Sequence, residues 1–348
     1  MRAVVLGYYG FGNVGDEAVL WAMRQHLQEV LPGLRLCVLS ADPEATAALH
    51  GTESVSRTDL KRVRRAMRES TVILSGGGSL FQDATSWRSP LYYGWLHELA
   101  ARERRPLVVY AQGVGPLRRS LSRWVTRRAM QHAARLTVRD ALSARLLAGL
   151  GVRAPVEVVC DPVLGLPFPE PIDRSPWVGV SLRPWPGMSL DPVLETTGRI
   201  REQIGVPVRV VCFHETRDRE VNEAVAHRVR AEELVVVRTP QEAWRAFCGA
   251  GLVVAMRLHA LLFAALAGAV PVGIAYDPKV QALADYLPGV EVVSLEDLRR
   301  GALQAAVERA WAARESKVRQ LRRAISSLSD RARAPARTVA ALVGGVPS

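Results

Sequence analysis

The chain has 348 residues, of which 49% are hydrophobic and 23% are charged, and its formal net charge is +12 at pH 7. These values exclude a disordered protein, and the length fits two domains of ordinary size. The positive charge favours an anionic partner such as a phosphorylated compound or an acidic membrane surface, unless the arginines reflect coding bias alone. No zinc spacing, RNP-like strand or helix-turn-helix pattern is present, so we expect no nucleic acid partner.

Cellular location and redox state follow from a few local features. The four cysteines form no C-x-x-C pair, and most lie in apolar, strand-like runs, so we expect buried free thiols. The N-terminal run Met1–Gly7 is too short for a signal peptide and is predicted as a strand. The apolar run 258–276 contains Gly268 and Pro271, which split it into a helix and a strand. We therefore expect a cytoplasmic protein that touches the inner face of the cell membrane only peripherally.

The first half of the chain repeats one pattern, a short β-branched run followed by a glycine-rich or charged turn and then a helix. The predicted strands cover residues 2–7, 34–40, 71–75, 107–111, 136–139 and 156–160. Alternation of strands and helices predicts a mostly parallel, doubly wound sheet. The carboxyl ends of such strands meet at one edge, and ligands bind there.

A proline-rich break at residues 166–171 is predicted to be a stiff linker, and the pattern then restarts with strands at 177–182, 208–213, 234–238, 252–256 and 270–276. We predict an N-terminal Rossmann-like domain over 1–168, a C-terminal one over 169–315 and a basic tail over 316–348, helical until Pro335. Two α/β domains facing a cleft are, by analogy, the architecture of sugar transferases of the GT-B type.

The first glycine-rich turn, Gly10-x-Gly12-x-x-Gly15, resembles a dinucleotide fingerprint, and Asp42 would supply the ribose carboxylate. Asp16 and Glu17 follow directly and would repel a pyrophosphate, which argues against NAD. The turn instead offers backbone N–H groups and the amide of Asn13 to sugar hydroxyls. The alternative is that its glycines serve only tight turns and close packing.

Two further strands end in glycine-rich sequences, Gly76-Gly77-Gly78-Ser79 and Gln112-Gly113-Val114-Gly115-Pro116. Glycine permits positive φ and a close approach of ligand to backbone. Either sequence alone would be an ordinary turn, but three at one sheet edge favour a binding cleft. Arg139 ends the next strand and is predicted to point into this cleft, the alternative being a surface arginine.

In the second half, Arg257-Leu258-His259 opens a predicted helix, and Tyr276-Asp277-Pro278-Lys279 follows the next strand. Only three of the 46 basic Lys and Arg residues are lysines, and Lys279 is one of them. A helix N-terminus flanked by Arg257 is suited to an anion, and His259 suits acid-base chemistry near neutral pH. The alternative is a capping or core histidine, and His214 is a second-rank candidate. No metal-ligand pattern is present, so we expect neither a metal nor a cofactor.

Taken in order, these motifs, together with Arg139-Asp140-x-x-Ser143 and Asp161-Pro162, resemble the polysaccharide pyruvyl transferases, most closely the bacterial cell-wall branch called CsaB. The resemblance implies a GT-B-like fold and transfer of pyruvate from phosphoenolpyruvate to a sugar, as a cyclic ketal with release of phosphate. In that branch the acceptor is N-acetylmannosamine on a lipid-diphosphate precursor, and the ketal anchors S-layer proteins. By position, the resemblance implies that Arg139, His259 and Lys279 are catalytic and that Arg257 contacts the substrate. We predict that further residues of these motifs bind substrate: Leu258, Asn13, Asp16, Glu17, Gly77, Gly78, Gln112, Gly113 and Tyr276.

Phosphoenolpyruvate carries a phosphate and a carboxylate, and several cations are needed to neutralise it. We hypothesise that Arg257 and Lys279 hold the phosphate, that Arg139 holds the carboxylate, and that His259 is the acid, the base or both. Two rivals remain, a GT-B glycosyltransferase that uses a nucleotide sugar and a non-catalytic protein that binds a phospho-sugar or lipid diphosphate. A basic face, formed by residues 57–68 or by the tail, would give access to a lipid-linked acceptor.

Overall fold

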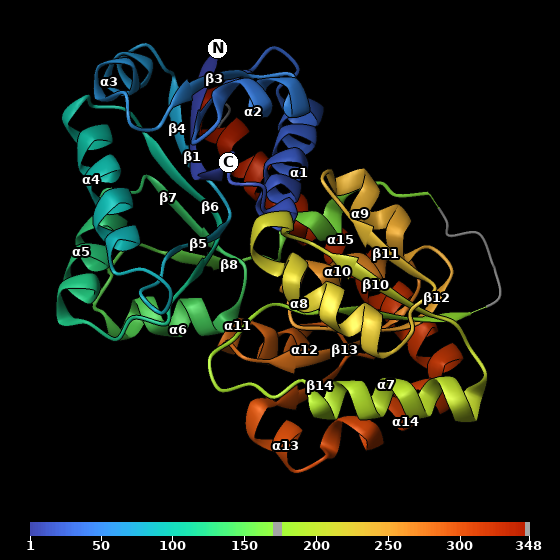
Figure 1. Cartoon of the computed structure of the whole chain (residues 1–348). Helices are drawn as coiled ribbons and strands as arrows, with labels where there is room; N and C mark the ends of the chain where they lie inside the picture. Colours follow the sequence, from blue (N-terminus) through green and yellow to red (C-terminus); the bar gives the residue numbers. More distant parts are fainter. Residues whose placement is uncertain (170–175, 345–348) are drawn as a thin grey trace. The chain divides into compact units, whose positions relative to one another are not determined.

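The computed structural model describes residues 1–169 and 176–344, which form two compact α/β units. Unit 1 contains Met1–Phe11, Asp16–Leu166 and the chain from Leu328 on, and unit 2 contains Gly12–Gly15 and Pro167–Ser327. The predicted linker over residues 166–171 lies partly outside the described residues. Each unit is a parallel sheet with helices on both faces (Figure 1).

Unit 1 has one sheet of eight strands in the order β3-β2-β1-β4-β6-β7-β8, with β5 paired to β6, and every pairing is parallel. The order reverses between β1 and β4, which creates a switch point at the carboxyl edge. The strands are β1 Arg2–Tyr9, β2 Arg35–Ser40, β3 Glu53–Ser56, β4 Val72–Ser75, β5 Gly78–Phe81, β6 Leu107–Val114, β7 Arg135–Val138 and β8 Val156–Val158.

Side chains alternate between the two faces of this sheet, as strand geometry requires. On β1, Val4 and Leu6 face one core, and Ala3 and Val5 face the other. The helices α3 Leu60–Arg68, α4 Arg88–Arg102, α5 Ser120–Gln131 and α6 Ala141–Gly149 cover the first core. The second core is covered by α1 Val14–Val30 and the end of α15 Arg314–Gly344; the short elements α2 Pro43–His50 and the 3₁₀ turn Pro162–Gly165 complete the unit.

Unit 2 repeats this topology with six parallel strands in the order β11-β10-β9-β12-β13-β14, and its switch point lies between β9 and β12. The strands are β9 Trp177–Ser181, β10 Val208–Cys212, β11 Glu233–Val236, β12 Ala250–Ala255, β13 Val270–Ala275 and β14 Glu291–Ser294. The helices are α7 Asp191–Ile204, α8 Glu215–Arg228, α9 Pro240–Phe247, α10 Leu258–Leu266, α11 Pro278–Gln281, α12 Leu283–Tyr286, α13 Leu295–Arg299 and α14 Ala302–Ala312.

The core of unit 2 also has two faces. One contains valines of β9, β10 and β12 packed under α7, α8 and α14. On the other, Phe213 stacks on Phe247 and also contacts Phe263, which joins α9 and α10 to the sheet. No helix of the described chain is long and apolar enough to cross a membrane. The apolar run 258–276 forms α10 and β13, as its glycine and proline residues predict.

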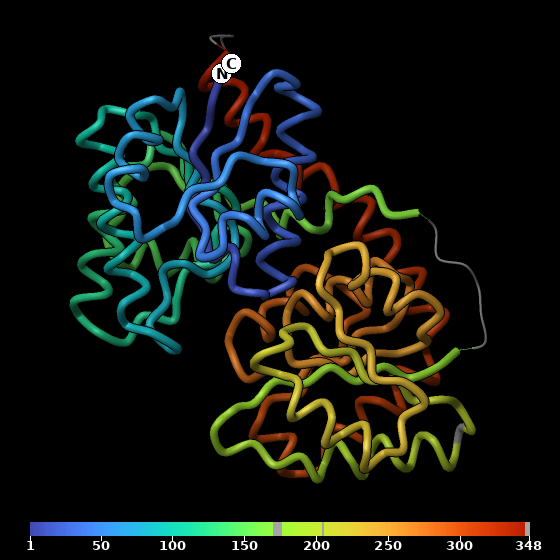
Figure 2. The backbone as a smooth tube through the Cα atoms, turned by 45° about the horizontal axis from the view of Figure 1, so that its top comes forward, coloured from blue at the N-terminus to red at the C-terminus, as the bar shows by residue number. Residues whose placement is uncertain are grey.

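The C-terminal helix corrects the prediction of a separate tail. α15 passes through Pro335, where the sequence pattern predicted its end, and runs to Gly344. It begins in unit 2, and from Leu328 on it belongs to unit 1, where Ala336 and Val339 join the core on the Ala3 side of β1. Figure 2 shows the last turns of α15 beside the start of β1. Burial of these small apolar side chains outweighs the one backbone hydrogen bond that proline removes.

Other differences are local. The sequence analysis missed the short strands β3, β5 and β14. It also treated Gln112–Val114 as a turn, although these residues complete β6 and are buried. Glycine misled the prediction here, because a buried strand accepts glycine wherever another group lies close to its backbone.

Candidate functional site

The glycine-rich sequences of unit 1 meet at the carboxyl edge of the sheet, because β1, β4 and β6 are neighbours and all run parallel. Gly10, Gly78 and Gly115 have positive φ angles of 76°, 92° and 95°. Residues with a Cβ atom rarely adopt such angles, so these turns need glycine. The predicted gathering of three glycine-rich segments at one edge is therefore present in the fold.

Some of these glycines also make room for side chains. A Cβ atom added to Gly77 would lie 2.5 Å from a methyl carbon of Val19, and one added to Gly78 would lie 2.8 Å from a carboxylate oxygen of Asp16. One added to Gly113 would lie 2.5 Å from the guanidinium of Arg139. Gly77, Gly78 and Gly113 thus position neighbouring groups, including one candidate catalytic residue.

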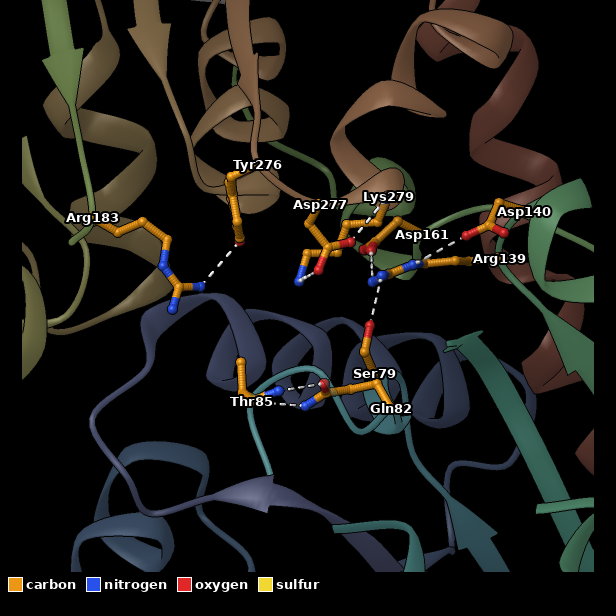
Figure 3. A network of polar contacts seen from close by, with 10 residues as sticks. All are labelled: Ser79, Gln82, Thr85, Arg139, Asp140, Asp161, Arg183, Tyr276, Asp277 and Lys279. Atoms are coloured by element: carbon orange, nitrogen blue, oxygen red, sulfur yellow. Dashed lines mark hydrogen bonds and ion pairs between the residues drawn. The ribbon is translucent and has the colours of Figure 1, made fainter. Parts of the chain in front are cut away.

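Arg139 follows β7 and is 3% exposed (Figure 3). Its guanidinium donates to Ser79 Oγ at 3.0 Å and to Asp161 Oδ2 at 3.4 Å, and Asp140 Oδ2 lies 3.6 Å from its Nε. Two carboxylates and a hydroxyl therefore fix the side chain at the edge. Asp140 also caps α6 through the backbone N–H of Ser143, as its position predicts.

Glu17 has a structural role in this edge. Its carboxylate is buried, accepts the backbone N–H of Gly10 at 2.9 Å and lies 2.8 Å from His50 Nε2. It fixes the turn that follows β1. Asn13 is partly exposed in the same turn, and Asp16 lies in the first turn of α1.

Gln112 is completely buried in β6, and its amide donates to Ser75 Oγ at 2.7 Å and to the carbonyl of Gly76 at 3.0 Å. Glu17 and Gln112 therefore make contacts that shape the turns around them, and their contact with a substrate stays a prediction. A sequence motif does not distinguish a residue that shapes a turn from one that contacts a ligand.

In unit 2, Arg257 is the N-cap residue of α10, and its side chain makes no capping hydrogen bond to that helix. Its Nε and Nη2 both donate to the carboxylate of Asp218, with 2.7 Å between Nη2 and Oδ1. This fork-like pair holds the guanidinium at the carboxyl end of β12. Leu258 is buried in the first turn of the helix, and His259 is the next residue.

Within the same unit, a Cβ atom added to Gly15 would lie 2.3 Å from Nδ1 of His259. The imidazole therefore packs against the last glycine of the first motif. A larger residue at position 15 would displace it, which gives this glycine a reason unrelated to dinucleotide binding.

Lys279 lies in α11, directly after β13, and its Nζ is 3.7 Å from Asp277 Oδ2 (Figure 3). Asp277 also caps this short helix by accepting the backbone N–H of Lys279. Tyr276, just before, accepts a hydrogen bond from Arg183 at 3.1 Å. Burial alone would raise the pKa of Tyr276, but Lys279, Arg183 and Arg257 together lower it. This end of β13 therefore lies in a positive electrostatic field.

Arg183 is a functional candidate that the sequence analysis did not single out. It follows β9, across the switch point from Arg257 at the end of β12. Its guanidinium lies 4.8 Å from the centre of the Tyr276 ring and 5.4 Å from that of Trp185. Its Nε is buried with no hydrogen-bond partner among the described residues. The sequence could have identified Arg183, because an arginine that follows a central strand lies at the edge of the sheet where ligands bind.

His214, the second-rank candidate, belongs to this group. It is 3% exposed after β10, and its Nδ1 lies 3.2 Å from Thr216 Oγ1. Burial and the nearby guanidinium of Arg257 lower its pKa to about 4, against an opposing effect of Asp218. The ring is therefore neutral at pH 7. Its Nε2 is buried and has no hydrogen-bond partner within the described part of the chain.

Asp218 was missed for a different reason. It lies inside α8, 39 residues before Arg257, and is completely buried. Nothing local marks it as anything but a helical acidic residue. Within residues 1–169 and 176–344, no group of three or more His, Cys, Asp and Glu side chains is arranged to hold a metal ion.

A family model described as polysaccharide pyruvyl transferase matches residues 13–278, which includes every predicted site residue except Lys279. No curated protein sequence matches the chain.

Solved structures with the same fold have low sequence identity to it. HepE from Anabaena, in complex with UDP and glucose, has a TM-score of 0.63 at 13% identity over 99% of this chain and 100% of its own. MnaA from S. aureus with UDP has a TM-score of 0.66 at 10% identity over 100% and 99%. MurG from Acinetobacter baumannii has a TM-score of 0.55 at 13% identity over 99% and 100%. The chain thus has a GT-B-like fold built from two doubly wound α/β units.

Proposed function

Because the chain belongs to the polysaccharide pyruvyl transferase family, we propose that it moves pyruvate from phosphoenolpyruvate to a glycan, forming a cyclic ketal and releasing phosphate. One observation carries this proposal. Arg257 at the start of α10 and Lys279 in α11 follow the adjacent strands β12 and β13. Two cations and a helix N-terminus are thereby gathered at one sheet edge, which suits a small phosphorylated anion.

In this proposal Arg257 and Lys279 hold the donor phosphate, and Arg139 holds the donor carboxylate. Asp218 orients Arg257, as Asp140 and Asp161 orient Arg139. Arg183 adds a guanidinium that contacts aromatic rings and a hydroxyl rather than a carboxylate in the described structure. Arg139 and Arg257 are each paired with a carboxylate, which reduces the positive charge that they present to an anion. Arg183 therefore supplies additional positive charge for the donor. No further cofactor is needed, since phosphoenolpyruvate is a co-substrate.

The reaction needs two proton transfers to the donor. A proton added to the methylene carbon makes C2 electrophilic, and one sugar hydroxyl adds to C2 and loses its proton. A second hydroxyl then displaces the phosphate and loses its proton, which the leaving phosphate takes up. Two C–O bonds form, one C–O bond to phosphate breaks, and the carbon skeleton becomes a ketal of pyruvate. His259 is the proposed acid, base or both in turn, because it lies next to Arg257 at the start of α10.

The proposed acceptor is N-acetylmannosamine in a lipid-diphosphate-linked cell-wall polysaccharide precursor, and the ketal would serve to anchor S-layer proteins. Support comes from the likeness of the motifs to the cell-wall branch, from the glycine-rich edge of unit 1 and from the net charge of +12. We place the enzyme in the cytoplasm, with peripheral contact at the inner face of the membrane.

The test is mass spectrometry of synthetic lipid-linked disaccharides incubated with the protein and phosphoenolpyruvate. A mass gain that corresponds to a pyruvate ketal, with equimolar phosphate release, is the expected result. His259→Gln should lose about 10²–10⁴-fold in rate if it transfers protons. Lys279→Arg should also lose activity, because a compact ammonium differs from a planar guanidinium in hydration and shape.

The rival function is transfer from a nucleotide sugar, which the shared fold with the UDP complexes of HepE and MnaA keeps open. Nucleotide release from a UDP-sugar, with no phosphate release from phosphoenolpyruvate, would establish that rival. Tight anion binding without turnover of either donor would instead indicate a non-catalytic binding protein.

A further inference from the structure

Unit 1 exposes large apolar side chains on three consecutive helices. Trp124 is 59% exposed and Leu121 is 52% exposed on α5, and Trp87 is 45% exposed just before α4. Trp95 on α4 and Leu142 on α6 are also exposed. A group of large apolar side chains exposed to water is unfavourable and marks an interaction surface. The concentration of these residues on α4–α6 therefore needs an explanation.

The residues Trp87, Leu121 and Leu142 share a position in the fold. They lie at or just before the first turns of α4, α5 and α6, which follow the parallel strands β5, β6 and β7. These helices pack on the same face of the sheet, and Figure 1 shows α4 and α5 at the left of the unit and α6 below them. The three side chains therefore lie along the carboxyl edge that also carries Arg139.

Contacts between the helix starts support this arrangement. The carboxylate of Asp83, before α4, accepts the backbone N–H groups of Arg118 and Arg119, before α5, at 2.8 Å each. Further along, Gly94 of α4 packs against Val125 of α5, where an added Cβ atom would lie 2.2 Å from a methyl carbon. The two helices thus start together and run side by side, which brings the exposed side chains of their first turns onto one surface.

The charges around these apolar residues are mainly positive. Arg88, Arg118, Arg119 and Arg123 are exposed there. The nearby carboxylates are engaged elsewhere: Asp83 with backbone N–H groups, and Asp140 with Ser143 N–H beside Arg139. Tryptophan and leucine interspersed with arginine match the interface of an anionic bilayer, where the ring enters the headgroup layer and the guanidinium pairs with phosphate.

We propose that the α4–α6 rim, meaning Trp87, Leu121, Trp124 and Leu142 with Arg88, Arg118, Arg119 and Arg123, docks onto an anionic lipid bilayer. This surface extends the proposed function, since it would bring the carboxyl edge of unit 1 to a lipid-linked acceptor. It differs from both basic surfaces suggested by the sequence. In α15, Arg331 donates to the backbone carbonyls of Val158 and Val159, and Arg333 donates to that of Gly165. The basic stretch 57–68 presents only Leu60 as a large exposed apolar side chain.

Flotation of the full-length protein with vesicles tests this surface. The protein should float with vesicles that contain phosphatidylglycerol and should remain behind with pure phosphatidylcholine. Leu121→Ser/Trp124→Ser should lower the partition coefficient at least about tenfold, and Arg119→Ser/Arg123→Ser should do the same at low salt. The matched control is Arg62→Ser/Arg68→Ser on α3, which removes the same charge and should leave binding unchanged. Thermal unfolding of each variant checks that it is folded.

Three results would overturn the proposal: no flotation with anionic vesicles, loss of binding in the α3 variant but not in the rim variants, or a dimer that Leu121→Ser/Trp124→Ser converts to monomer. The last would show that a second copy of the chain covers the rim. Pyruvyl transfer to a soluble acceptor is measured alongside. If transfer persists while flotation fails, only the docking surface is wrong, and if flotation succeeds without transfer, only the proposed function is wrong.

Discussion

Arg139 and Arg257 both form ion pairs with carboxylates of the protein. Arg139 lies beside Asp140 and Asp161, and Arg257 forms a two-pronged pair with Asp218. A buried guanidinium without such a partner would destabilise the fold, because it loses its hydration. These carboxylates offset that loss and fix the orientation of both guanidinium groups. The same pairing reduces the net charge available to an anion. Arg183 donates instead to the hydroxyl of Tyr276, so its charge is available to an anion.

We expect Arg183→Gln to raise the KM for phosphoenolpyruvate about tenfold or more, with a smaller effect on kcat, because it removes a cation that binds the donor in its ground state. Arg219→Gln, an exposed position on α8, is the control and should leave KM unchanged. Steady-state kinetics with varied donor concentration measure both constants. An unchanged KM in Arg183→Gln would remove this residue from the site.

Gly113→Ala should reduce pyruvyl transfer by an order of magnitude or more, since its Cβ atom would lie 2.5 Å from the Arg139 guanidinium and must displace it. Gly149→Ala is the matched control, because a Cβ atom added there would meet no atom within 4 Å apart from its chain neighbours and the backbone of its own helix. Initial rates of phosphate release compare the two variants. Equal rates would mean that the position of Arg139 does not matter for turnover.

At the scale of elements, the helix α15 has the most informative arrangement. Its first half belongs to unit 2, and its end is part of the core of unit 1. Arg331 and Arg333 donate to backbone carbonyls near β8 and the 3₁₀ turn after it. Some arginines of the C-terminal segment therefore hold the helix on unit 1 through hydrogen bonds. The apolar side chains of Ala336 and Val339 on the same helix are buried in the core.

Val339→Asp should lower the free energy of unfolding by about 3 kcal/mol or more, because it buries a carboxylate in an apolar core. Ala341→Asp, exposed two residues further on, should change stability by less than about 0.5 kcal/mol. Urea unfolding followed by circular dichroism gives both values. Equal stability of the two variants would show that this stretch of helix does not contribute to the core.

At the scale of the whole molecule, buried histidines link stability to pH. Burial lowers the pKa of His26, His97 and His214 to about 4 each. The two ring nitrogens of His97 lie 3.1 Å from the carbonyl oxygen of Ala129 and 2.8 Å from Ser75 Oγ. An unfolded chain protonates histidine near pH 6.5, so between pH 6.5 and 4 the unfolded state binds more protons than the folded one.

Stability should therefore be independent of these groups above about pH 7 and should fall as the pH is lowered from 6.5 towards 4, by up to about 3 kcal/mol for each histidine. Urea unfolding at a series of pH values measures this slope. His97→Gln should make the slope shallower, even if it lowers stability at pH 7, and His227→Gln on the exposed side of α8 should leave it unchanged. A slope unaffected by His97→Gln would mean that this ring takes up its proton equally readily in the folded and the unfolded protein.

The sequence by itself determined the parts of the molecule that depend on neighbours along the chain. Alternating apolar runs and glycine or proline punctuation predicted two parallel α/β units, and a helix start at Leu258 followed from the end of the preceding strand. The motifs also located the segments that reach the carboxyl edges, because a parallel sheet brings every strand end to the same side.

Only the tertiary structure decided which side chains meet there. Arg257 pairs with Asp218 across 39 residues, Arg139 with Ser79 across 60, and Arg183 with Tyr276 across 93. It also decided that Glu17 and Gln112 shape turns, and that a helix with a proline in it completes the core of unit 1. Local pattern fixes a strand end and the edge it reaches, whereas side-chain partners depend on sheet order and on packing between segments far apart in the chain.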